Sequence, residues 1–203
     1  MAQISKISKS MTFAPQQDPL LILVDLQREF MTDGSFMQIV ESGPALQNCR
    51  RLLAHARSRG WPIAHVRWVH QANRSGRASE FTDWIEGVRP QASEMVFEKE
   101  FPSCYTDQAF AKMMDAGSGN SAVVAGLAGS VSCLATLIEG SSRAHKLVFA
   151  ADASASHGIR DVSEKQAHEV AVFIASQFVP VVDTLTLIRN AGVNKSWESD
   201  VMV

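Results

Sequence analysis

The sequence has few cysteines, no surplus of positive charge and no long apolar run. Its three cysteines (Cys49, Cys104 and Cys133) form an odd, widely spaced set, unlike a disulfide framework or a CxxC zinc site, and favour a reducing compartment. Nineteen Lys and Arg against twenty-one Asp and Glu give a formal net charge of −2. Nucleic acid and membrane are therefore not expected as partners.

No apolar stretch approaches the roughly 18 residues that a membrane span requires. Residues 1–18 are polar and lack the apolar core of a signal peptide. We therefore expect a cytoplasmic protein. The 203 residues, 46% hydrophobic and 20% charged, are sufficient for one globular domain with its own core. We expect an N-terminal arm over 1–18, the domain over 19–190 and a C-terminal tail over 191–203.

Short apolar runs alternate with helical stretches along the chain. Strands are expected over 20–24, 62–69, 95–97, 121–125, 146–150 and 179–182, and helices over 45–59, 107–116, 132–144 and 161–178. Strands that are apolar on both faces are typical of a parallel sheet covered by helices. The pattern predicts an α/β protein: a three-layer α/β/α sandwich around a doubly wound, mostly parallel, six-stranded sheet. The long insertion at 70–93 is of a length that is usually functional or disordered.

Residues capable of chemistry follow several of the predicted strands. Asp25 follows the first strand, Lys99 follows the third, and Cys133 lies in a glycine-containing turn after the fourth. Ligands of open parallel sheets bind beyond the carboxyl ends of the strands. A thiol at a helix N-terminus beside a lysine has a lowered pKa and is a usable nucleophile. The carboxylate could accept its proton, and the backbone of the turn could hold an oxyanion.

These segments resemble the isochorismatase-like cysteine hydrolases over about residues 19–185. The resemblance is carried by LILVDLQREF (21–30), by Lys99 with PSCY (102–105), by VAGLAGSVSCLAT (124–136) and by FAADAS (149–154). It implies a catalytic triad of Asp25, Lys99 and the cysteine of the turn. Such a triad attacks the carbonyl of a small amide, carbamoyl or ureido compound and forms a thioester-type intermediate. The resemblance also implies an oxyanion turn with a cis peptide between Ala128 and Gly129, and a homo-oligomer, either a dimer or a tetramer.

The sequence departs from this pattern at the nucleophile. The usual spacing from Gly126 reaches Ser132, and the cysteine follows at Cys133. Cys133 could be the nucleophile in a longer turn, or Ser132 could occupy the position as a weaker nucleophile or a replacement. A third possibility is that Asp25 works alone, as in isochorismatases proper, which hydrolyse a vinyl ether without a covalent intermediate. A non-catalytic relative that acts as an interaction module is a further alternative.

Five residues are predicted to line the substrate pocket: Gln27, Phe30, Trp68, Trp84 and Tyr105. A metal site is not expected, because metal-dependent relatives use an Asp-x-His pair and this chain contains none. His65 and His70 lie five residues apart on and after a strand, where their side chains point to opposite faces. We expect no cofactor and a small-molecule substrate as the main partner.

Overall fold

The computed structural model describes residues 18–35, 37–69, 83–117 and 120–190. Nearly all of the expected N-terminal arm, the expected tail and most of the 70–93 insertion therefore lie outside the described residues. The described chain forms one sheet of six parallel strands in the order β3-β2-β1-β4-β5-β6. The strands are β1 (Leu20–Val24), β2 (Ile63–Trp68), β3 (Met95–Lys99), β4 (Ser121–Gly126), β5 (Lys146–Ser154) and β6 (Val181–Val182).

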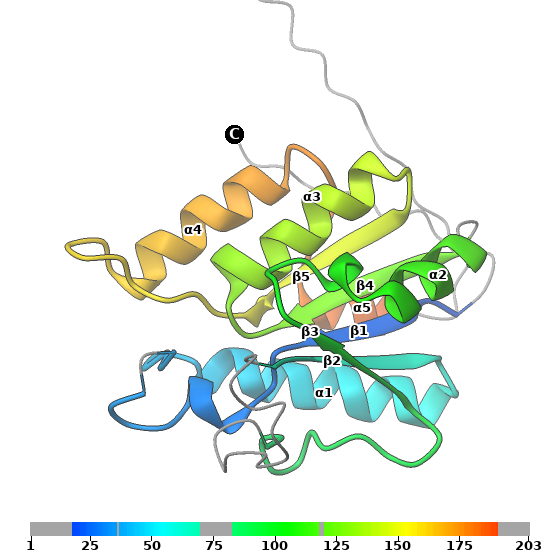
Figure 1. The fold of residues 1–203 in the computed structure, drawn as a ribbon, viewed down its shortest axis with the longest axis horizontal. Helices are drawn as coiled ribbons and strands as arrows, with labels where there is room; N and C mark the ends of the chain where they lie inside the picture. The colour runs from blue at the N-terminus through cyan, green and yellow to red at the C-terminus, as the bar shows by residue number, and fades with distance from the viewer. Residues whose placement is uncertain (1–17, 36, 70–82, 118–119, 191–203) are drawn as a thin grey trace, which may run out of the picture.

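Helices cover both faces of the sheet (Figure 1). They are α1 (Gly43–Arg59), α2 (Gln108–Ala116), α3 (Leu134–Ser142), α4 (Glu164–Ala175) and α5 (Thr184–Asn190), with short turns η1 (Arg28–Phe30), η4 (Cys104–Thr106) and the π-helical η5 (Gly129–Cys133). The predicted doubly wound α/β/α architecture is confirmed. None of the helices in the described ranges is long and apolar enough to cross a membrane.

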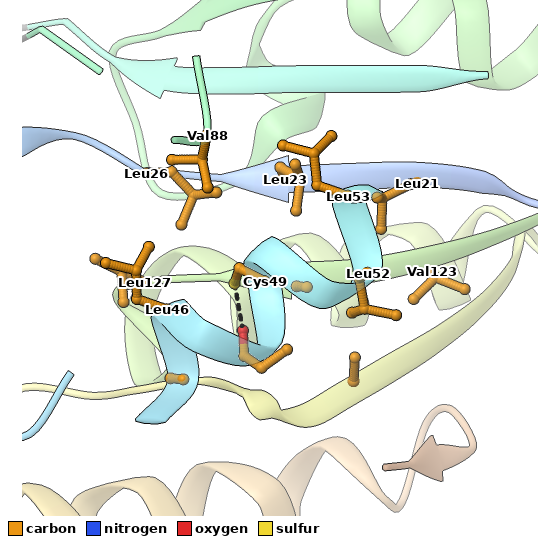
Figure 2. Packing of buried hydrophobic residues seen from close by; sticks show 14 of the residues in the cluster. Leu21, Leu23, Leu26, Leu46, Cys49, Leu52, Leu53, Val88, Val123 and Leu127 are labelled. Carbon is orange, nitrogen blue, oxygen red and sulfur yellow. Dashed lines mark hydrogen bonds between the residues drawn. The ribbon is translucent and has the colours of Figure 1, made fainter. Parts of the chain in front are cut away.

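The apolar run of β1 explains the two cores. Leu21 and Leu23 point to one face of the sheet and pack with α1 and α5, whereas Ile22 and Val24 point to the other face and pack with α2, α3 and α4. This alternation follows from the two-residue period of a strand. Figure 2 shows α1 against the first face, where the Cys49 thiol donates a hydrogen bond to a β5 carbonyl.

Local signals fix the ends of two predicted helices. Ser163 and Gln166 form the expected capping box at the start of α4. Gly60 ends α1 in the left-handed conformation, with φ of 71°. Helix α5 is not among the helices expected from the sequence. Its seven residues are too few to show a helical period, and its first turn depends on Asp183, whose carboxylate accepts hydrogen bonds from Thr186.

Candidate active site

The order of the sheet creates a switch point between β1 and β4. The chain leaves β1 toward β2 and β3 on one side, and it leaves β4 toward β5 and β6 on the other. Crevices at such points, beyond the carboxyl ends of the strands, are where ligands of open α/β sheets bind. Asp25 follows β1 directly, η5 follows β4, and Lys99 is the last residue of β3. The topology thus brings three distant segments to one edge.

Asp25 and Lys99 form a buried ion pair. Lys99 Nζ lies 3.0 Å from Asp25 Oδ2, and both side chains are fully buried. Asp25 has a left-handed backbone with φ of 53°, a conformation uncommon outside glycine. Burial raises the pKa of Asp25, while the Lys99 charge and the Ser132 hydroxyl oppose that rise. Asp25 Oδ1 makes no hydrogen bond of normal geometry within the described residues, although Ser132 is close enough to act on its pKa.

The second partner of Lys99 is Ser132. Lys99 Nζ donates to Ser132 Oγ over 3.0 Å, and Ser132 is fully buried in η5. The structure therefore brings the alternative nucleophile position, Ser132, together with Asp25 and Lys99. Side chains of neighbouring helical residues differ in direction by about 100°, so only one of Ser132 and Cys133 can face Lys99.

Cys133 lies against the main chain behind the turn. Its Sγ is 3.6 Å from the Leu127 carbonyl oxygen, 3.8 Å from that of Gly126, and 3.8 Å from Ser154 Oγ. Burial, together with the nearby Asp25 carboxylate, raises the pKa of Cys133 well above its ordinary value. A thiol in this environment stays protonated near neutral pH and is a poor nucleophile. The geometry does not support Cys133 as the attacking group.

Trp68, one of the predicted pocket residues, contacts Lys99. Lys99 Nζ lies 3.9 Å from the centroid of its indole ring. Gln27 is buried and holds the backbone of Trp68 from both sides: its Oε1 accepts from the Trp68 N–H over 2.6 Å, and its Nε2 donates to the Trp68 carbonyl over 2.9 Å. Gln27 therefore fixes Trp68 instead of presenting its amide to a substrate.

The other three predicted pocket residues have their own partners. Phe30 belongs to the core around α1, Trp84 packs edge-on to its neighbour, and the Tyr105 hydroxyl is hydrogen bonded over 2.8 Å. Their respective aromatic neighbours are His157, His65 and His145. These contacts do not bring the three side chains to Asp25, Lys99 or Ser132.

Four backbone N–H groups in and after the predicted oxyanion turn have main-chain partners. The Ala128 carbonyl accepts hydrogen bonds from the N–H groups of Val131, Ser132 and Cys133, and the Gly129 N–H donates to the Ala155 carbonyl over 2.6 Å. No peptide bond among the described residues is cis, so the expectation of a cis bond between Ala128 and Gly129 is wrong for this structure. The physical reason is the strong preference of a non-proline peptide for the trans form. The ammonium of Lys99 is a hydrogen-bond donor outside the turn, and it lies beside Ser132 Oγ.

Thr136, whose hydroxyl donates a hydrogen bond to the carbonyl of Ser132, is not among the site residues expected from the sequence. The signal is its position four residues after Ser132, which places both residues on one side of a helix. Among the described residues, no group of three or more His, Cys, Asp or Glu side chains could hold a metal ion. His70, one of the two histidines considered for a metal site, lies outside the described residues.

Several solved structures share this fold. A cysteine hydrolase from Pseudomonas syringae pv. phaseolicola 1448A has a TM-score of 0.80 at 21% identity, with 91% of this chain and 98% of that chain covered. An isochorismatase from Pseudomonas putida KT2440 has a TM-score of 0.75 at 23% identity, with coverages of 86% and 93%. N-carbamoylsarcosine amidase from Thermoplasma acidophilum has a TM-score of 0.65 at 20% identity, with coverages of 83% and 97%. At these identities the likeness concerns the fold.

Sequence comparison assigns the family. The uncharacterized isochorismatase family protein YddQ of Bacillus subtilis (strain 168) is 30% identical over 88 residues, which are 42% of this chain and 48% of that protein. The match therefore spans about half the length of that relative. Residues 19–185 match the family model Isochorismatase, described as the isochorismatase domain. Because this match covers most of the chain and the fold agrees, the protein belongs to the isochorismatase family.

Proposed function

We propose that the protein hydrolyses a small amide or carbamoyl compound, with Ser132 as the attacking group. The observation that carries this proposal is the position of Lys99 Nζ, which lies 3.0 Å from both Asp25 Oδ2 and Ser132 Oγ. A hydroxyl, a carboxylate and an ammonium thus form one hydrogen-bonded group at the switch point of the sheet. This arrangement has the parts that nucleophilic catalysis requires: an attacking atom, a base and a cation.

In the first step, Ser132 Oγ attacks the carbonyl carbon and its proton passes to Asp25. The new C–O bond places negative charge on the carbonyl oxygen, and Lys99 stabilises it. The raised pKa of Asp25 makes its carboxylate a stronger base than an ordinary aspartate. When the C–N bond breaks, Asp25 returns the proton to the leaving nitrogen, and the acyl group remains on Ser132 as an ester.

In the second step, water attacks the ester and gives a proton to Asp25. The C–O bond to Ser132 then breaks, and the proton of Asp25 returns to Ser132 Oγ as the acid product leaves. The amidase among the structural neighbours supports a carbamoyl or amide group as substrate. Asp25 and Lys99 neutralise each other, which suits a reacting group without charge, since an unpaired charge in such a buried place is costly.

A second candidate function is hydrolysis of a vinyl ether without a covalent intermediate. The observation in its favour is also the raised pKa of Asp25, because a carboxyl group that holds its proton is a general acid able to protonate a carbon–carbon double bond. In that reaction Ser132 forms no bond to substrate. The two functions therefore predict different effects of removing its hydroxyl.

The test is turnover of a panel of small amides, carbamoyl compounds and vinyl ethers by four variants. We expect Ser132→Ala and Asp25→Asn to lower amide turnover by about 1,000-fold or more, the scale at which a nucleophile acts. Cys133→Ala and the control Ser142→Ala, an exposed serine on α3, should stay within about 3-fold of the parent chain, an ordinary range for residues outside the chemistry. Mass spectrometry of a slow substrate should find the acyl group on Ser132.

Amide turnover that survives in Ser132→Ala would overturn the proposal. Vinyl ether turnover that needs Asp25 but not Ser132 would establish the second candidate instead. Two results together would support attack by the Cys133 thiol instead. These are loss of turnover in Cys133→Ala and an acyl group on Cys133 of the parent chain.

A further inference from the structure

The hydroxyl of Thr136 joins two segments that are distant in the sequence. Its Oγ1 accepts a hydrogen bond from the backbone N–H of Cys104 over 3.0 Å and donates one to the carbonyl of Ser132 over 2.8 Å. Thr136 is fully buried in the first turn of α3. One hydroxyl therefore holds two main-chain groups at a fixed separation.

One of these segments contains Ser132 and the other follows Lys99, two of the three residues of the candidate active site. Cys104 opens η4, which follows closely after Lys99 at the end of β3. Ser132 lies in η5, immediately before α3. The 3.0 Å bond between Lys99 Nζ and Ser132 Oγ depends on the separation of these segments, and Thr136 spans them.

A hydroxyl is the chemical requirement at this position. The N–H of Cys104 is at the start of a short helix, where no preceding turn offers it a carbonyl. Valine has nearly the shape of threonine but can neither donate nor accept, so it would leave the buried N–H of Cys104 without a partner. Serine lacks only the methyl group and keeps both hydrogen bonds.

We infer that Thr136 is a positioning residue, which helps to set the distance between Lys99 and Ser132 by bonding the carbonyl of Ser132 and the N–H of Cys104, five residues after Lys99. This inference rests on the proposed function. Since Thr136 acts through the main chain of its two neighbours, its removal should slow the chemical step and leave substrate affinity nearly unchanged.

The experiment compares Thr136→Val with Thr136→Ser, and with Thr106→Val as the matched control. Thr106 also uses its hydroxyl in the segment after Lys99, but it donates within that segment, to the Ser103 carbonyl. We expect Thr136→Val to lower kcat by about 10- to 100-fold with KM changed by less than about 2-fold, the scale of a small misplacement of reacting groups. Thr136→Ser and Thr106→Val should stay within about 3-fold of the parent kcat, since both keep the bridge. A Thr136→Ser variant as slow as Thr136→Val would overturn the inference, because the methyl group would then be the cause.

A second readout does not depend on turnover. In Ser132→Cys the new thiol takes the place of the hydroxyl beside Lys99, and the ammonium should lower its pKa. Burial raises the pKa of Cys49 and Cys104 to about 12 and that of Cys133 well above its ordinary value, so the native thiols stay silent near neutral pH. Thiolate absorbance against pH therefore follows the thiol at position 132.

Adding Thr136→Val to Ser132→Cys should raise the pKa of the new thiol, whereas adding Thr136→Ser should leave it unchanged. An identical titration in Ser132→Cys with and without Thr136→Val would overturn the inference, whatever the activity of the parent chain. If no amide is turned over but the titration shifts as expected, the hydrolytic proposal fails and the positioning role of Thr136 stands.

Discussion

The indole ring of Trp68 covers the ammonium of Lys99 at 3.9 Å from the ring centroid. The same ammonium binds Asp25 and Ser132, so it is held by a carboxylate, a hydroxyl and an aromatic face. The main chain of Trp68 is fixed independently by Gln27. A cation over a tryptophan face gains about 2 kcal/mol when the pair is desolvated. Trp68 therefore stabilises the charged form of Lys99 and helps to hold its ammonium in place.

Replacing this ring should weaken catalysis without unfolding the strand. We expect Trp68→Leu to lower kcat/KM by about 10- to 30-fold, which corresponds to loss of about 2 kcal/mol of cation stabilisation. Trp68→Phe keeps an aromatic face and should lose less than about 5-fold. Steady-state kinetics on the best substrate of the panel measures both. Equal losses in the two variants would show that the size of the side chain matters here and not its aromatic face.

Removing the Lys99 ammonium should destabilise the fold, because it leaves the buried carboxylate of Asp25 without a counter-ion. We expect Lys99→Met to lower the free energy of unfolding by about 3 to 5 kcal/mol at neutral pH, because Asp25 loses its counter-ion. The double variant Asp25→Asn/Lys99→Met should recover most of this loss, and both should be inactive. Denaturant unfolding measures the stability, with Lys112→Met, an exposed lysine of α2, as the control. Additive losses in the double variant would contradict the ion pair.

Glu94 should contribute to the acid stability of the fold. Burial opposes its ionisation, but hydrogen bonds from Arg57, the Gln91 N–H and His65 hold its pKa at about 2, below the ordinary 4.5. A lowered pKa stabilises the folded state above about pH 4.5, and this contribution is lost as the pH falls toward 2.

Glu94→Gln should therefore lose roughly 1 to 3 kcal/mol at pH 7 and show a flatter stability profile between pH 4.5 and 2. Urea unfolding over this pH range measures both effects, and Glu169→Gln, whose side chain is 63% exposed, is the control. A Glu94→Gln profile parallel to that of the parent chain would argue that this network carries no pH-dependent stability.

The fold could be predicted because its elements have strong local signals. The run Leu20–Val24 is apolar on both faces, which is typical of a covered parallel strand, and the Ser163 capping box marks the start of α4. The same strand ends led to Asp25 and Lys99, because parallel strands present their carboxyl ends at one edge. Their contact in the structure follows from that topology.

The details of the site depend on information that a linear pattern lacks. Whether Ser132 or Cys133 faces Lys99 depends on the turn η5, where a π-helical hydrogen-bond pattern changes the direction of each side chain. Phe30 and Tyr105 lie near site residues in the sequence, yet packing with other elements directs them elsewhere. Such directions are fixed by neighbours from distant parts of the chain.

Gly126 ends β4 with φ of 138°, and a Cβ atom there would lie 2.0 Å from the Val24 carbonyl oxygen. The main chains leading to Asp25 and to the Ser132 turn are therefore pressed together with no room for an intervening side chain. A larger residue at position 126 would force apart the two segments that lead to Asp25 and Ser132. If the proposed function holds, substitutions that alter substrate preference should therefore lie elsewhere than at position 126.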